Sequence, residues 1–169
     1  ASGVLDSGFG TGGITVTPAG ASVSLALNAL ARDPDGRIYA AGSATSAGVT
    51  SQVVARCSSS GVLDTGYSIN PVPRAGNDSA FAISLWPSGH IWTAGYSKLP
   101  GGAREFMISR FDERGRPDAG FGINGSVYIP VGDGNSTAYA LAFEWMSLGA
   151  ARIPGGSLMP HTEPVFWYS

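Results

Sequence analysis

Hydrophobic residues occur along this chain in short runs, which are interrupted by Gly, Pro, Asp and Ser. Alanine-rich runs at 26–31, 80–85 and 138–143 predict strands, and turn residues follow the first two, as in Asp33, Pro34, Asp35 and Gly36. Since such turns reverse the chain, the next runs are expected to return antiparallel. These runs and the strands after them lie at 37–42, 52–57, 90–95 and 105–111. No helix is needed to account for the pattern.

The pattern repeats three times. The segment that begins at Gly3 returns at Gly61 and again at Gly115, with a period near 54 residues. Each unit is expected to start with an Asp turn and a first strand, such as 13–17 or 126–129. Four short antiparallel strands in about 54 residues are typical of a β-propeller blade. The sequence therefore predicts one all-β domain over 1–169, with blades at 1–60, 61–114 and 115–169.

The repeated residues resemble a known family, the bacterial repeat called delta-sixty. Its units resemble Leu-Asp-x-x-Phe-Gly, then Asp-Gly-Lys-Ile-x-x-Ala-Gly, then Ala-Arg-Tyr. The first unit carries this pattern at Leu5, Asp6, Phe9, Gly10, Asp35, Gly36, Arg37, Ile38, Ala41, Gly42, Ala55 and Arg56. The third unit departs from it after Ala142 and is expected to be degenerate. The resemblance implies a propeller fold and no single activity.

Three blades do not close a ring, because propellers usually have four to eight. Two chains would supply six blades around a shared two-fold axis, so a homodimer that forms a six-bladed propeller is predicted. The alternative fold is a β-trefoil, which has three four-stranded units and closes as a monomer. Its units are usually shorter than the repeat found here.

Composition excludes several classes of protein. The formal charge is only −2, and one lysine and nine arginines are scattered along the chain, so no nucleic-acid partner is expected. No apolar run reaches the roughly 18 residues that span a bilayer, so no membrane partner is expected either. The single cysteine, Cys57, is expected to be an apolar filler. The sequence does not indicate a compartment.

Familiar catalytic and cofactor motifs are incomplete in this sequence. Gly8–Gly13 matches the spelling G-x-G-x-x-G, but a strand is predicted after it where a nucleotide site needs a helix, so no nucleotide cofactor is expected. The repeated Asp6, Asp64 and Asp118 are expected to accept hydrogen bonds from nearby backbone amides. Only two histidines are present. His90 follows a turn glycine and is the candidate general base.

Two polar loops before the alanine-rich strands provide the candidate metal site. They contain Asn77, Asp78, Asp133 and Asn135. If the alanine-rich strands are innermost, these loops surround one mouth of the central channel. Carboxylate and amide oxygens are ligands for Ca²⁺, so a calcium site is one interpretation. The other is that these residues only form turns.

Two hypotheses on function follow. The first is a binding or scaffold module of a bacterial repeat protein, with a small molecule as one candidate partner. The second is a calcium-dependent hydrolase that opens a lactone or ester in the channel, suggested by analogy with propeller enzymes. Metal would polarise the carbonyl, and Asp78, Asp133 or His90 would move the proton. The sequence leaves open whether the protein is an enzyme.

Overall fold

The protein is all-β in the part of the chain that the computed structural model describes, which comprises residues 3–17, 23–67, 76–131 and 136–142. These residues form seven strands and no helix. The strands are β1 (Val23–Arg32), β2 (Ile38–Ser46), β3 (Val49–Cys57), β4 (Asn77–Leu85), β5 (Ile91–Lys98), β6 (Arg104–Phe111) and β7 (Ser126–Ile129). The alanine-rich runs at 26–31 and 80–85 are confirmed as strands, within β1 and β4.

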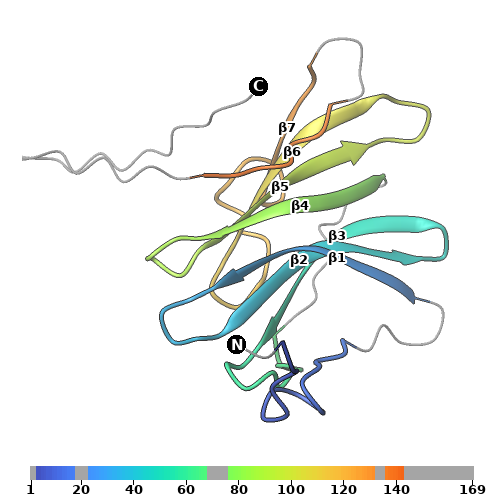
Figure 1. The fold of residues 1–169 in the computed structure, drawn as a ribbon. Helices are drawn as coiled ribbons and strands as arrows, with labels where there is room; N and C mark the ends of the chain where they lie inside the picture. The colour runs from blue at the N-terminus through green and yellow to red at the C-terminus, as the bar shows by residue number, and fades with distance from the viewer. Residues whose placement is uncertain (1–2, 18–22, 68–75, 132–135, 143–169) are drawn as a thin grey trace, which may run out of the picture.

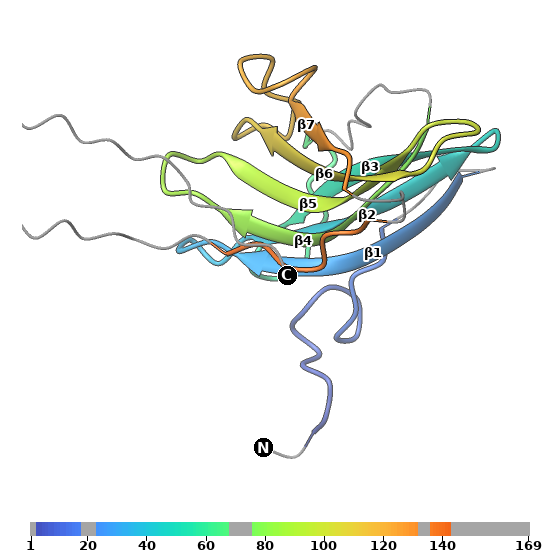
Figure 2. The same ribbon diagram turned by 90° about the horizontal axis from the view of Figure 1, so that it is seen from above.

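The strands follow one another in chain order across the sheet (Figure 1). β1, β2 and β3 are antiparallel neighbours, and so are β4, β5, β6 and β7. A single parallel bridge between Thr50 and Asn77 joins the two groups. Seen from above, the strands fan out and the sheet curves strongly (Figure 2). We call β1–β3 the first unit and β4–β7 the second unit.

The turns between strands explain why each unit is antiparallel. In the β1–β2 turn, the Asp33 amide donates to the Arg37 carbonyl at 3.0 Å, and the Asp33 carboxylate accepts from the Arg37 amide and side chain. The β4–β5 turn has the same backbone bond between Trp86 and His90, at 2.8 Å. The predicted hairpins are therefore present, and side chains reinforce the backbone turn.

A bulge interrupts β1 and β4, the first strands of the two units, at the same place. The pairing skips Asn28 in β1 and Phe81 in β4. Opposite the bulges stand Gly42 and Gly95, where an added Cβ would overlap the carbonyl oxygens of the bulged strand. The glycine of the repeated Ala-Gly pair is therefore required by close backbone approach.

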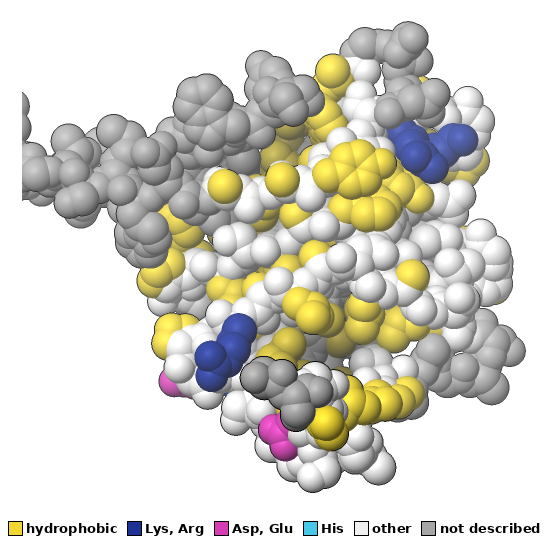
Figure 3. All heavy atoms as spheres, viewed as in Figure 1, with side chains coloured by type: hydrophobic (Ala, Val, Ile, Leu, Met, Phe, Trp, Pro, Cys, Tyr) yellow, Lys and Arg dark blue, Asp and Glu magenta, His cyan; other side chains and the backbone are white. Residues whose placement is uncertain are grey.

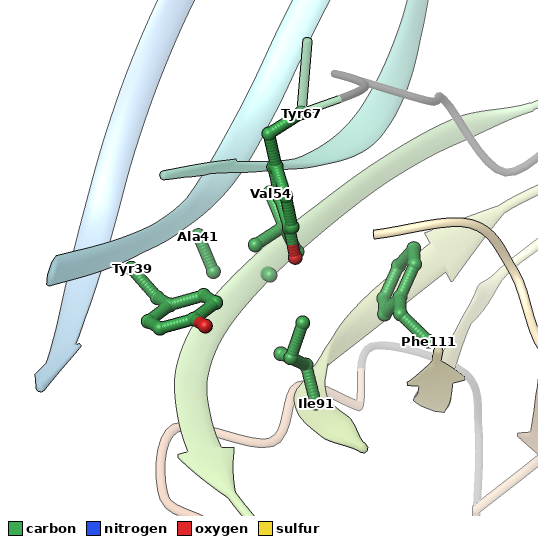
Figure 4. Close-up of a cluster of buried hydrophobic side chains, with 7 residues drawn as sticks. Tyr39, Ala41, Val54, Tyr67, Ile91 and Phe111 are labelled. Carbon is green, nitrogen blue, oxygen red and sulfur yellow. The ribbon is translucent and has the colours of Figure 1, made fainter. Parts of the chain in front are cut away.

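The main hydrophobic core lies between the two units. It contains Tyr39, Ala41 and Val54 from the first unit, Tyr67 from the loop after it, and Ala80, Ile91 and Phe111 from the second (Figure 4). β4 contacts all three strands of the first unit. A buried hydrogen bond of 2.7 Å from Gln52 Nε2 to Thr93 Oγ1 crosses the same interface. The units thus stack face to face, as neighbouring propeller blades do.

The outward side of the first unit is more exposed than the matching side of the second. Leu30 in β1 is 72% exposed, whereas Ile83, at the equivalent position of β4, packs against the core. The first unit covers β4. Among the described residues, the side of β4 that the first unit covers therefore corresponds to a side of β1 that is open.

Three strand assignments differ from those expected from the sequence. Residues 126–129, expected to begin the third unit, pair with β6 and form the fourth strand of the second unit. Residues 13–17, expected to be a strand, contain only isolated bridges at Ile14. Residues 138–142 form no strand, and Phe143 lies outside the described residues. The blade boundaries, the six-bladed dimer and the β-trefoil stay predictions. No described helix is long and apolar enough to cross a membrane.

Candidate functional site

The Asp turn after β6 is held by its own backbone and by an arginine. Asp118 Oδ1 accepts a hydrogen bond from the Gly120 amide at 2.9 Å, and the Asp118 carbonyl accepts from the Phe121 amide at 2.9 Å. Arg110 Nε donates to Asp118 Oδ2 at 2.7 Å. The Arg110 guanidinium also lies 4.9 Å from the centre of the Phe121 ring. The turn thus joins a charge pair to a cation–π contact.

The first unit repeats this arrangement. Arg56 Nε donates to Asp64 Oδ2 at 3.1 Å, and the Arg56 guanidinium lies 4.3 Å from the centre of the Tyr67 ring. The hydrogen bond from Arg56 holds the pKa of the Asp64 carboxyl below its usual value. We call each set a turn cluster. The first is Arg56, Asp64, Tyr39 and Tyr67, and the second is Arg110, Asp118, Trp92 and Phe121.

An edge-to-face aromatic pair completes each turn cluster. Tyr39 and Tyr67 have ring centres 6.0 Å apart at 83°, and Trp92 and Phe121 have ring centres 5.0 Å apart at 73°. Such pairs add to the stability that burial provides. The expected hydrogen bonds from backbone amides to the Asp side chains are confirmed. The arginines of the turn clusters were not predicted. Their constant spacing of eight residues before each Asp was the available signal.

The candidate base His90 lies beside the second turn cluster. Its Nε2 is 3.5 Å from Asp118 Oδ2, and its Nδ1 is 2.7 Å from Ser88 Oγ. Its side chain is 38% exposed. Asp78 opens β4 and His90 follows its end, so they are separated by about 25 Å of strand. The structure therefore pairs His90 with Asp118 and not with Asp78.

The candidate calcium ligands are only partly within the described residues. Asn77 and Asp78 begin β4, and Asn77 Oδ1 accepts a hydrogen bond from the Thr50 amide at 3.3 Å. Asp78 is buried. Asp133 and Asn135 lie outside the described residues. Among those described, no three His, Cys, Asp or Glu side chains gather as a metal site would require. The calcium site stays a prediction.

Phe81, Tyr96, Arg104 and Tyr139 contact one another and form an aromatic patch. Figure 3 shows one face of the molecule, on which hydrophobic side chains gather near Lys or Arg side chains. Phe81 stands between two rings, with centres 6.0 Å from Tyr96 and 5.2 Å from Tyr139. The Arg104 guanidinium lies 4.3 Å from the centre of the Tyr96 ring, and Tyr139 is 69% exposed. The bulge at Phe81 positions this patch.

The sequence matches a family model over part of its length. A model described as "Domain of unknown function (DUF5122) beta-propeller" matches residues 34–67, which include β2, β3 and the first Asp turn after them. None of the curated proteins compared with the sequence matches it. The match and the fold together define a propeller-type module. They support a β-propeller repeat family, and the resemblance to the delta-sixty repeat in particular stays a prediction.

Proposed function

We propose that this chain is a binding or scaffold module of a β-propeller-type repeat protein. The observation that carries the proposal is that the repeated charged residues form ion pairs with one another. Arg56 and Asp64 bind each other, as do Arg110 and Asp118. The turn residues Asp33 and Arg37 do the same. Since these groups stabilise turns, the repeat itself needs no catalytic explanation.

The aromatic patch is the ligand-binding surface in this proposal. Tyr139 offers an exposed ring, Phe81 supports it, and Arg104 adds a positive charge beside Tyr96. Sugar rings stack their C–H faces on aromatic side chains, and guanidinium groups bind carboxylates. We therefore propose an acidic oligosaccharide as the ligand class, bound without chemical change.

Isothermal titration calorimetry with a trigalacturonate and with uncharged cellotriose tests this proposal. We expect Tyr139→Ala to weaken binding of both sugars and Arg104→Met to weaken binding of the charged one about tenfold. Arg114→Met is the matched control, because Arg114 lies in the exposed turn after β6. Chromatography of the recovered sugars should show no products. Failure of both sugars to bind at millimolar concentration, or their cleavage, would contradict the proposal.

The calcium-dependent hydrolase is the second candidate function. Its support is the polar set of Ser88, His90 and Asp118, in which the histidine ring lies between a hydroxyl and a carboxylate. A panel of lactones assayed with calcium and then with a chelator tests it. Calcium-dependent turnover supports the hydrolase, and no turnover in either condition rejects it. If the Asp78→Asn, Asp133→Asn double variant retains full activity, these two carboxylates are not the calcium ligands.

A further inference from the structure

Residues 3–17 share a series of left-handed backbone conformations with residues 115–129. Gly10 and Gly122 both have a φ of 55°, and Gly13 and Gly125 have φ values of 90° and 83°. Residue 12 and residue 124 are also both left-handed, at 62° and 52°. Since side chains resist this region, the shared sequence of positive φ values marks a common fold of the two segments. We call them the N-terminal turn segment and the second turn segment.

The internal hydrogen bonds of the two segments also match. The Gly8 amide donates to Asp6 Oδ1 at 2.9 Å, as the Gly120 amide does to Asp118. The Thr11 amide donates to the Ile14 carbonyl at 2.8 Å, and the bond between the equivalent residues 123 and 126 is 2.7 Å. Residue n of the N-terminal turn segment thus corresponds to residue n + 112.

The N-terminal turn segment contacts the loop after β3 in the same way that the Tyr67 turn contacts the loop after β6. The Phe9 ring lies against Gly61, just as the Tyr67 ring lies against Gly115. The Gly10 amide donates to the Ser60 carbonyl at 2.8 Å, and Thr15 Oγ1 donates to the Gly61 carbonyl at 2.6 Å. The segment is therefore placed against the first unit as the Tyr67 turn is placed against the second.

Arg110 of β6 forms three hydrogen bonds with the second turn segment. Arg110 donates to Asp118, the Arg110 amide donates to the Gly125 carbonyl at 2.8 Å, and the Asp118 amide donates to the Arg110 carbonyl at 2.9 Å. β7 then pairs with β6. Among the described residues no strand provides these bonds to Asp6, Gly13 or residues 14–17. Ile14 and Val16 are 53% and 75% exposed.

We propose that the N-terminal turn segment is the docking site for the third strand of a further repeat unit of the same class. The strand would carry an arginine that binds Asp6 and packs on Phe9, and it would pair with residues 14–17. The unit behind this strand would cover the open side of β1, where Leu30 is exposed. This inference is independent of the ligand proposed above, and its test does not involve a sugar.

A fusion protein tests the proposal. A copy of residues 76–112 placed directly before Ala1 puts the copied Arg110 eight residues before Asp6, the spacing found in both turn clusters. Ser109 and Ser126 are direct partners in the β6–β7 ladder, with their hydroxyl oxygens 2.7 Å apart. The corresponding pair in the fusion is the copied Ser109 and Ile14. Cysteines at such paired positions are suited to disulfide formation.

The variants are made with Cys57→Ala, so that no other thiol competes. We expect the fusion with Ser109→Cys in the copy and Ile14→Cys to form an internal disulfide under glutathione oxidation. The matched control replaces Ile14→Cys with Val16→Cys, two residues out of register, and should cross-link at least tenfold less. Arg110→Met in the copy should slow the Ile14 cross-link.

Equal cross-linking of both positions, or none at Ile14, overturns the proposal. A copied unit that stays unfolded gives the second result, and it counts against the proposal because the same sequence folds beside residues 115–129. A further arm measures the mass of the original chain in solution by light scattering. A dimer that Asp6→Asn disrupts would assign the site to a second copy of this chain and would overturn the proposal as stated.

Discussion

Arg110 and Asp118 are eight residues apart in the chain and are joined by a 2.7 Å hydrogen bond from Nε to Oδ2. Both side chains are about a quarter exposed, so the pair is partly shielded from water. The same relationship recurs between Arg56 and Asp64. The pair ties the end of the third strand to the Asp turn, and this connection is the common element of the two units.

Removal of the Arg110 charge should destabilise the protein. Arg110→Met keeps an aliphatic side chain but loses the bond to Asp118 and the cation–π contact with Phe121. We expect the free energy of unfolding, measured with urea, to fall by about 1 kcal/mol. Arg114→Met, in an exposed turn, should change it by less than about 0.5 kcal/mol. Equal effects of the two variants would show that the turn cluster does not stabilise the fold.

Acid should weaken the first turn cluster. Arg56 lowers the pKa of Asp64 in the folded state, so the unfolded state takes up a proton at higher pH than the folded state does. The contribution of this carboxylate is present above its unfolded pKa of about 4 and is lost as pH falls through the folded value. Urea unfolding at pH 7 and pH 3 measures the change.

The matched variants are Asp64→Asn, which removes the titrating group, and Arg56→Met, which removes the cause of the shift. Each should lose less stability between pH 7 and pH 3 than the unchanged protein loses. An unaltered pH dependence in both variants would contradict the assignment of acid sensitivity to this pair.

The glycine opposite the β4 bulge should not tolerate a side chain. In Gly95→Ala the new Cβ would overlap the Ser79 carbonyl, which belongs to the backbone and cannot rotate away. We expect a loss of about 1–3 kcal/mol in the free energy of unfolding. Gly102→Ala is the control, because its Cβ would meet its nearest neighbour at an ordinary 3.4 Å. A tolerated Gly95→Ala would mean that the bulge can relax.

The buried bond between the units should be sensitive to loss of one partner. Thr93→Val keeps the volume of the side chain but removes the hydroxyl that accepts from Gln52 Nε2. A buried amide without its partner costs about 1–3 kcal/mol. Thr65→Val, at an exposed turn position, is the control. If Thr93→Val were as stable as the control, the Gln52 bond would not contribute to unit stacking.

The strands and hairpins could be predicted from sequence because their signals are local. The alanine runs alternate with turn residues, and the breakers before Arg37 and His90 mark reversals of the chain. The partner of residues 126–129 could not be obtained in this way. Strand pairing across a long turn depends on tertiary contacts, and the glycine-rich turn at 120–125 brings this strand back onto β6.

The site was predicted less completely than the fold. His90 was predicted from its residue type and its position after a turn glycine. Its neighbour Asp118 became evident only when the Asp turn was seen against the β4–β5 hairpin. The aromatic patch depends on the bulge that turns Phe81 toward Tyr96 and Tyr139. A bulge shifts side chains between faces without a simple trace in the hydrophobic pattern.

Hydrogen–deuterium exchange of β1 and β4 tests most directly the central claim that the two units stack as successive members of one repeat. The strands have equivalent sequences and pairings. Among the described residues, however, β4 contacts all three strands of the first unit and its Ile83 packs against the core, whereas the equivalent Leu30 of β1 is exposed. We predict that amides of residues 80–85 exchange at least tenfold more slowly than those of residues 27–32. Equal exchange, or faster exchange in β4, would contradict the stacking of the first unit on the second.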